Sequence, residues 1–255
     1  ILRQLKQYSI AGIRPVLIDL SYLYVEIDTT LYYNTNAVSD PELLRAKVLK
    51  TLTTYSDSPD VNSFGGRFKY SKVVGLIDDT NKAITSNITK VKMRRDLVPA
   101  FGDFATYELC FGNKFHQKRS GFSIKSSGFT YANVQGPVYI GDQPIDSKTG
   151  KLIFFRLENN IPIIVKTNAG TVDYEKGELV LDVVNITSTE LDSGVIQVEA
   201  IPDSNDIIAL RDLYLQVDIN NSKVVAIQDI VTSGENTSAT QYITTSSYLN
   251  GSYTR

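Results

Sequence analysis

The sequence predicts an α+β fold, in which an N-terminal domain of mixed strands and helices is followed by a β-rich domain. Helical periodicity and helix-capping residues occur before about residue 98. Short strand-like runs separated by turn residues follow that point. We therefore expect an α/β domain at residues 1–98, a β-rich domain at residues 99–230 and a Ser/Thr-rich C-terminal arm at residues 231–255.

The first strand is predicted at residues 21–34, SYLYVEIDTTLYYN, because apolar residues alternate there with a period of two. The predicted core face consists of Leu23, Val25, Ile27, Thr29, Leu31 and Tyr33. The opposite face consists of Tyr22, Tyr24, Glu26, Asp28, Thr30 and Tyr32. Tyrosines on such a face can be exposed to water, covered by a second layer of the same chain, or covered by a partner subunit. Tyr22, Tyr24 and Tyr32 are therefore the candidate residues for a self-association interface.

Two helices are predicted after this strand. The first begins with Asp40 as its N-cap and Pro41 at the first helical position. Its apolar stripe consists of Leu44, Val48, Leu52 and Tyr55. The second is shorter and begins with Ser71 as its cap. A returning strand, SNITKVKMRRDL, completes the order strand, helix, helix, strand, which predicts helices on one face of a sheet.

The second half of the chain reads as short strands, such as TYELCFGN, KLIFFRLEN and GELVLDVVNI. The segments DSKTG and YEKG separate some of them, and we expect Gly150 and Gly177 to adopt positive φ in these turns. This spacing is typical of a sandwich or a β-rich mixed domain.

The composition is that of a soluble globular protein, because 42% of the 255 residues are hydrophobic and 21% are charged. No run of about 18 apolar residues occurs, so we expect no membrane insertion. The net charge of −2 gives no general attraction to nucleic acid. One cysteine, Cys110, cannot form an intrachain disulfide, which is compatible with a reducing cytoplasm. The chain begins with Ile1 rather than Met, so we expect it to be part of a longer protein.

Residues suited to catalysis are scarce. His116 is the single histidine and lies among basic loop residues, which favours an exposed loop position over a catalytic role. Cys110 lies in a strand-like run, which favours an inert buried thiol over a reactive one. One Cys and one His cannot form the usual four-ligand zinc site. We therefore expect no enzyme activity, no cofactor, no metal and no small-molecule substrate.

Two basic clusters remain, KVKMRRD and HQKR. A strand with a solvated basic face explains the first without a ligand, and a nucleic-acid groove is the less favoured interpretation. We therefore expect no nucleic acid among the partners.

The order of several segments resembles the baseplate J-like family of contractile phage tails. In the first half these segments are AGIRPVLIDLSYLYVEIDTTLYYN, DPELLRAKVLKTL and FKYSKVVGLIDDTNKAITSNITKVKMRRDL. Later ones, including YELCFGN, SSGFTY, GTVDYEKGELVL and IALRDLYLQVDI, resemble the large baseplate wedge proteins of T-even-type phages within that family. The resemblance covers roughly residues 11–229 and implies the C-terminal portion of a longer chain.

This resemblance implies a structural component of the virion, located in the tail baseplate and assembled in the cytoplasm of the host bacterium. It also implies a homodimer or ring-forming homo-oligomer around the tail tube that docks other wedge proteins. It carries over no catalytic residue. The alternative is a β-rich adhesive or carbohydrate-binding module of a virion surface, which exposed aromatic residues in a cleft of the C-terminal half would favour.

Overall fold

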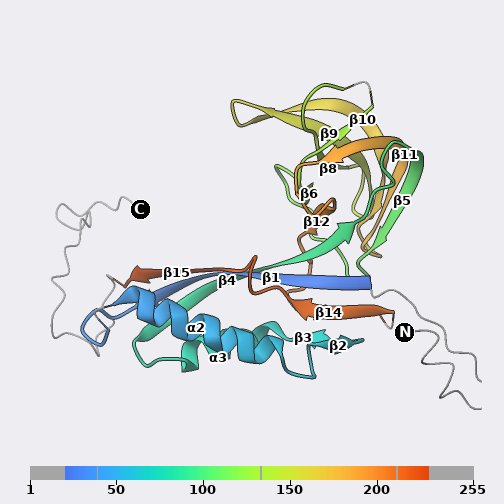
Figure 1. Ribbon diagram of the computed structural model, residues 1–255. Helices are drawn as coiled ribbons and strands as arrows, with labels where there is room; N and C mark the ends of the chain where they lie inside the picture. Colours follow the sequence, from blue (N-terminus) through green and yellow to red (C-terminus); the bar gives the residue numbers. More distant parts are fainter. Residues whose placement is uncertain (1–20, 39, 133, 211, 230–255) are drawn as a thin grey trace, which may run out of the picture. The chain divides into compact units, whose positions relative to one another are not determined.

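The computed structural model describes residues 21–38, 40–132, 134–210 and 212–229 (Figure 1). The predicted arm at residues 231–255 lies outside these residues. The described helices are α2 (Pro41–Ser56) and α3 (Tyr70–Asp79). The described strands are β1 (Ser21–Tyr33), β2 (Ser63–Phe64), β3 (Arg67–Phe68), β4 (Ile84–Leu97), β5 (Phe104–Cys110), β6 (Ile124–Ser126), β7 (Phe129–Tyr131), β8 (Tyr139–Pro144), β9 (Thr149–Glu158), β10 (Ile161–Asp173), β11 (Glu178–Thr189), β12 (Ile196–Ala200), β13 (Ile207–Ile208), β14 (Leu213–Val217) and β15 (Lys223–Gln228).

Most of the described strands belong to one mixed sheet. Its hydrogen-bonded order is β2-β14-β1-β4-β12-β6-β8-β9-β10-β11-β5, with β15 also paired to β1 and β7 also paired to β11. β1 pairs in parallel with β14 along its first half and with β15 along its second half. The remaining strands, β13 and β3, form a separate antiparallel pair.

The prediction of an α+β fold is wrong, because the protein is mostly β. Among the described residues, 51% are in strands and 13% are in two helices. Both predicted helices exist, but the strands beside them do not form a sheet of their own. β1 pairs with strands almost 200 residues later in the chain, and β4 pairs with β12. These long-range pairings join the helical region to the large sheet, and no local periodicity reports them.

Contacts along the chain divide it into two compact units. The β-rich unit contains the described residues of 21–26, 56–69 and 91–218. The helix unit contains the described residues of 27–55, 70–90 and 219–229. Both β1 and β4 therefore contribute residues to each unit. The predicted boundaries after residues 98 and 230 stay a prediction.

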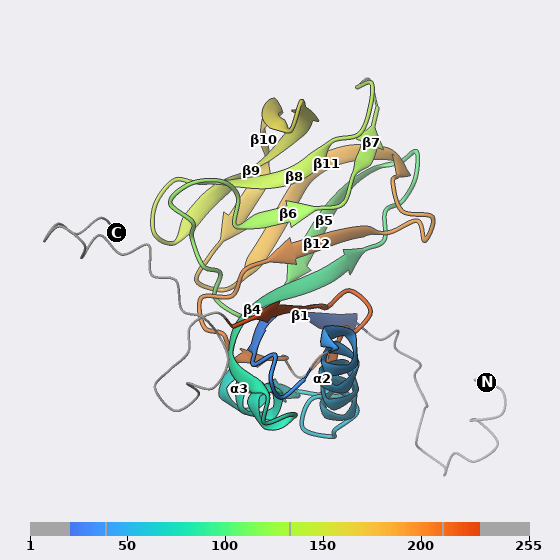
Figure 2. The same cartoon turned by 90° about the vertical axis from the view of Figure 1, so that its left-hand side faces the viewer.

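In the helix unit, α2 and α3 lie on one face of the strands (Figures 1 and 2). The Asp40 side chain accepts a hydrogen bond from the backbone N–H of Glu42 at 2.9 Å, which confirms the predicted N-cap of α2. The predicted apolar stripe of α2 is buried as well: it consists of Leu44, Val48, Leu52 and Tyr55. The second helix begins at Tyr70, so Ser71 lies inside it and the predicted cap is wrong.

The predicted core face of β1 is confirmed. All six residues are buried: Leu23, Val25, Ile27, Thr29, Leu31 and Tyr33. Within the helix unit, the Thr29 and Thr89 hydroxyls form a buried hydrogen bond of 2.9 Å, and the Tyr70 hydroxyl donates to the Thr89 carbonyl at 2.9 Å. The polar atoms on this face are therefore satisfied where the helices cover it.

In the β-rich unit, a buried tyrosine organises one part of the core. The Tyr174 hydroxyl donates to the Asp142 carboxylate at 2.8 Å, and the other oxygen of Asp142 accepts the backbone N–H groups of Ser123 and Ile124. Gly177 has φ +70°, as the predicted turn requires. Gly150 instead lies in β9, and a Cβ there would be 2.8 Å from the Tyr174 ring. The expected positive φ at Gly150 is wrong, because this glycine serves close packing rather than a turn.

Candidate assembly surface

The candidate tyrosines of β1 lie in different units. Tyr22 and Tyr24 belong to the β-rich unit, and Tyr32 belongs to the helix unit. All three side chains are partly exposed. The rings of Tyr22 and Tyr24 stack with their centroids 5.4 Å apart, and Tyr22 also meets the edge of Tyr214 at 5.7 Å. Tyr214 in turn contacts Phe64 at 5.1 Å. Tyr22 and Tyr24 thus have aromatic neighbours within their own chain.

A buried arginine lies beside this aromatic group. The Arg94 guanidinium is 4.3 Å from the centroid of the Tyr24 ring. Its Nη1 donates to Glu26 at 2.6 Å and to Asp218 at 2.8 Å, and its Nε donates to Asp96 at 3.0 Å. Arg94 is only 3% exposed and Glu26 only 4%. Buried charges are tolerated when they are paired and hydrogen-bonded, so the carboxylates and the guanidinium require each other.

The buried Arg94 overturns part of the prediction for KVKMRRD. Lys90 is exposed, as expected for a solvated basic face, whereas Arg94 is buried. The sequence signal that was missed is Glu26, an acidic residue on the tyrosine face of β1 that needs a cation once it is buried. Asp218 follows β14 and is 124 residues from Arg94, so spacing along the chain could not identify it.

Burial shifts the protonation equilibria of this cluster. It raises the pKa of Glu26 above the ordinary value of 4.5, and Arg94 pulls in the opposite direction. Burial also raises the pKa of the Tyr24 hydroxyl. One guanidinium faces three carboxylates here, so the cluster carries excess negative charge when all of them are ionised.

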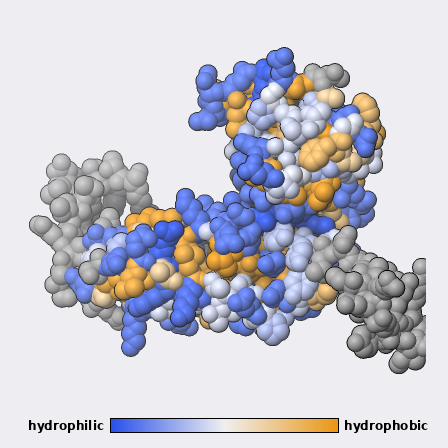
Figure 3. All heavy atoms as spheres, in the orientation of Figure 1, coloured by the Kyte–Doolittle hydropathy of each residue, from blue (hydrophilic) through white to orange (hydrophobic). Residues whose placement is uncertain are grey.

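The second half of β1 forms an open sheet face in the helix unit. Asn87 points toward the helices, because its side-chain amide donates to Asp78 at 2.7 Å and to the carbonyl of Val74 at 3.3 Å. Its neighbour Ile88 therefore points to the opposite side and is 55% exposed. Tyr32 pairs with Ile227 across β1 and β15, and Ile227 is 45% exposed. In Figure 3, hydrophobic atoms lie over β15 on the side of the sheet away from the helices.

This open face also contains a shallow cavity of about 280 Å³. Its lining combines polar, charged and apolar side chains: Asp28, Thr29, Thr30, Tyr32, Ile88, Lys90, Lys223 and Val225. We call the set Asp28, Tyr32, Ile88, Lys90, Lys223 and Ile227 the open face. No element among the described residues of the helix unit covers it, in contrast to the helix-covered side.

The residues considered for chemistry are not organised as a reactive site. His116 is about half exposed, and its Nδ1 lies 3.7 Å from Asp203. Cys110 is partly buried, and burial raises the pKa of its thiol, which disfavours the reactive thiolate. The described residues contain no group of three or more His, Cys, Asp or Glu side chains that could hold a metal ion. None of the described helices is long and apolar enough to cross a membrane.

Comparison with known proteins gives two matches. Residues 21–96 match the family model for baseplate structural protein gp6, C-terminal domain III. This range runs from β1 through both helices to β4. The chain is also 26% identical over 128 residues to the baseplate wedge protein gp6 of Enterobacteria phage T4, a region that covers 50% of this chain and 18% of that protein. The chain thus spans about a fifth of the length of this curated relative. The two matches support a structural protein of the phage virion tail, related to the baseplate wedge proteins of T4-type phages.

Proposed function

We propose that the chain is a baseplate wedge subunit that self-associates, as a homodimer or within a ring around the tail tube, and docks other wedge proteins. The single observation that carries self-association is the open face of the helix unit. Ile88 and Ile227 are exposed beside Tyr32 on a sheet whose other side is covered by helices. Apolar residues gathered on one sheet face suit a protein–protein contact better than water.

The charges around the open face support contact with a second copy. Asp28 lies across from Lys223 in the register of β1 and β15, and Lys90 lines the same cavity. In a two-fold symmetric interface each patch meets itself, so a surface with charges of both signs can be self-complementary. An apolar centre with a charged rim is the usual anatomy of such contacts.

Tyr32 is the candidate tyrosine that this proposal uses directly. Tyr22 and Tyr24 already contact Tyr214 and Arg94, which leaves less of their surface for a partner. Their participation in the interface stays a prediction. The wedge role is structural, and we assign no residue to catalysis.

The proposal is tested by light scattering after size exclusion, over a hundredfold range of protein concentration. A mass that rises to at least twice the monomer mass of 28.3 kDa is expected. A monomer at every concentration would show that this chain has no self-association surface of its own and would overturn the proposal.

A further inference from the structure

A groove lies on one face of the β-rich unit, whereas the residues assigned to self-association belong to the helix unit. The face is formed by β4, β12, β6, β8, β9 and β10, which lie side by side in this order (Figure 2). A cavity of about 670 Å³ lies between the loop at residues 117–121 and the β9–β10 hairpin. A smaller cavity of about 120 Å³ adjoins it, because Lys118 and Phe122 line both. We call the two cavities together the cationic groove.

The floor of the cationic groove is apolar. The Phe122 ring stacks on Phe155 with their centroids 4.5 Å apart. This position depends on Gly141, because a Cβ at that residue would lie 2.9 Å from the Phe122 ring. Ile153, paired with Gly141 across β8 and β9, and Ile164 of β10 extend the apolar lining. The floor can therefore accept apolar side chains of a ligand.

The β9–β10 hairpin beside the groove has apolar side chains that are exposed to solvent. Asn159 and Asn160 have φ of 51° and 63°, which makes a tight turn between β9 and β10. Leu157 and Ile164 share the face of Phe155 in the register of the two strands, and both are exposed. Figure 3 shows hydrophobic and hydrophilic residues side by side near this hairpin. Between Phe155 and Gly170 the two strands pair only with each other among the described strands, because β8 meets β9 no further than Phe155 and β11 meets β10 only from Gly170. Two strands without further neighbours are marginally stable in water, so a partner covering this apolar face would stabilise it.

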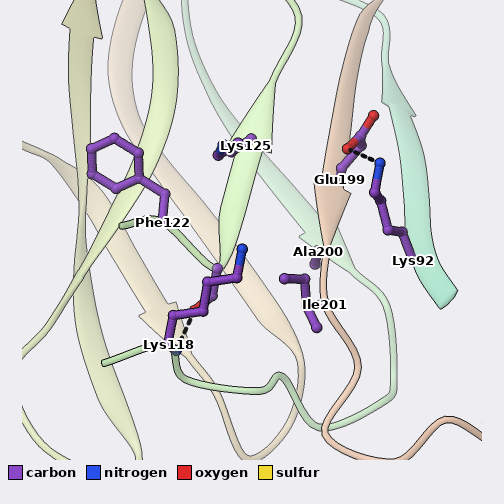
Figure 4. Close-up of a pocket in the computed structure, with 8 residues that line it drawn as sticks. Lys92, Lys118, Phe122, Lys125, Glu199, Ala200 and Ile201 are labelled. Carbon is purple, nitrogen blue, oxygen red and sulfur yellow. Dashed lines mark hydrogen bonds and ion pairs between the residues drawn. The ribbon is translucent and has the colours of Figure 1, made fainter. Parts of the chain in front are cut away.

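The rim of the groove is basic. Lys118, Arg119 and Lys125 are exposed and form no ion pair with any residue that the structure describes. Figure 4 shows Lys118 and Lys125 on one side of the smaller cavity and the pair Lys92–Glu199, at 3.4 Å, on the other. Among the residues that the structure describes, the only other carboxylate lining the two cavities is Asp142, which is buried and already accepts hydrogen bonds. The groove is thus locally positive in a chain with a net charge of −2.

We propose that the cationic groove binds a segment of a partner protein that carries carboxylate side chains next to apolar ones. This inference rests on the proposed docking of other wedge proteins and names the chemistry of one docking segment. The apolar side chains would lie over Phe122 and Ile164, and the carboxylates would meet Lys118, Arg119 and Lys125. The mainly aliphatic lining favours a protein segment over nucleic acid, because single strands bind by stacking bases on several aromatic rings. Phe122 is the one aromatic side chain that lines the cavities in the described part of the chain.

Fluorescence anisotropy with the full chain tests this proposal. The probe is a fluorescein-labelled peptide of alternating isoleucine and glutamate, and the control peptide has glutamine in place of glutamate. We expect the acidic peptide to bind at least tenfold more tightly than the control, and 0.5 M NaCl to remove most of that difference. Lys118→Glu combined with Arg119→Glu should weaken binding at least tenfold, and Ile164→Asn should weaken it several-fold.

Lys47→Glu combined with Lys50→Glu, at exposed positions of α2, is the matched charge control and should leave peptide binding unchanged. Equal binding of the two peptides, or equal losses in the groove variant and the α2 variant, would overturn the proposal. Tighter binding of a single-stranded DNA of similar charge would overturn it in favour of nucleic acid. Light scattering on the same samples separates this result from self-association, because the groove variant should keep the mass of the unmodified chain.

Discussion

The two halves of β1 carry the same alternating pattern but end in different surroundings. In the first half, Tyr22 contacts Tyr214 and Tyr24 contacts Arg94 of the same chain. The buried Glu26 forms an ion pair with Arg94. In the second half, Tyr32 lies on an open face beside Ile227. The polar face of the first half is therefore covered by residues of the β-rich unit, and no described element of the helix unit covers the polar face of the second half.

Alternation along β1 therefore identifies the two faces of the strand but not what covers the second face. The covering residues of the first half, Tyr214 and Asp218, lie about 190 residues away along the chain. Substitutions in each half of β1 can show whether the half with more contacts to its own chain also contributes more to the free energy of unfolding.

The largest effect is expected at the buried cation. Arg94→Met leaves Glu26, Asp96 and Asp218 without their shared partner and should lower the free energy of unfolding by about 3–5 kcal/mol. Urea denaturation followed by circular dichroism measures this. Lys90→Met, on the same strand but exposed on the open face, is the control and should change stability by no more than about 0.5 kcal/mol. Similar losses in both variants would contradict the distinction between the two halves.

A smaller difference is expected between two tyrosines. Tyr24→Ser removes the stacked ring and the cation–π contact with Arg94, and should cost about 1–3 kcal/mol. Tyr32→Ser should cost about 0.5 kcal/mol or less in the monomer, because its ring lies on the open face. Thermal and urea unfolding at low protein concentration compare the two. A larger loss in the Tyr32 variant would reverse the comparison.

The smallest effect is expected from pH. Because burial raises the pKa of Glu26 in the folded protein, its stabilising contribution is full below the ordinary value of 4.5 and is lost as the pH rises through the raised pKa. Glu26→Gln should therefore gain stability relative to the unmodified chain between pH 4 and pH 7, by about 1.4 kcal/mol for each unit by which the pKa is raised. Urea titrations at several pH values measure the difference. A loss of stability in the Glu26→Gln variant over this pH range would mean that Arg94 lowers the pKa of Glu26 more than burial raises it.

Local structure was largely predictable from the sequence. The core face of β1 and the cap of α2 depend on residues within a few positions of each other, so periodicity and capping rules identify them. The fold class was not predictable in this way, because it depends on β1 pairing in parallel with β14 and β15. Gly150 was misassigned for the same reason, since its role depends on the distant Tyr174 ring.

The candidate surface was predictable only in part. The sequence identified Tyr22, Tyr24 and Tyr32 as a set, and nothing local separates them. What distinguishes Tyr32 is the cross-strand neighbour Ile227 and the exposure of Ile88, which depend on the register of β15 and on the side that the helices cover. Arg94 was misread as solvated because its partners are distant along the chain: Glu26 lies in β1, and Asp218 follows β14.

If the open face around Tyr32 carries self-association, two matched variants, Tyr32→Ser and Tyr22→Ser, should differ in solution mass. Light scattering at the concentration where the unmodified chain is associated measures both masses. We expect the Tyr32 variant to be a monomer and the Tyr22 variant to keep the associated mass. An associated Tyr32 variant together with a monomeric Tyr22 variant would contradict the account and move the interface to the first half of the strand.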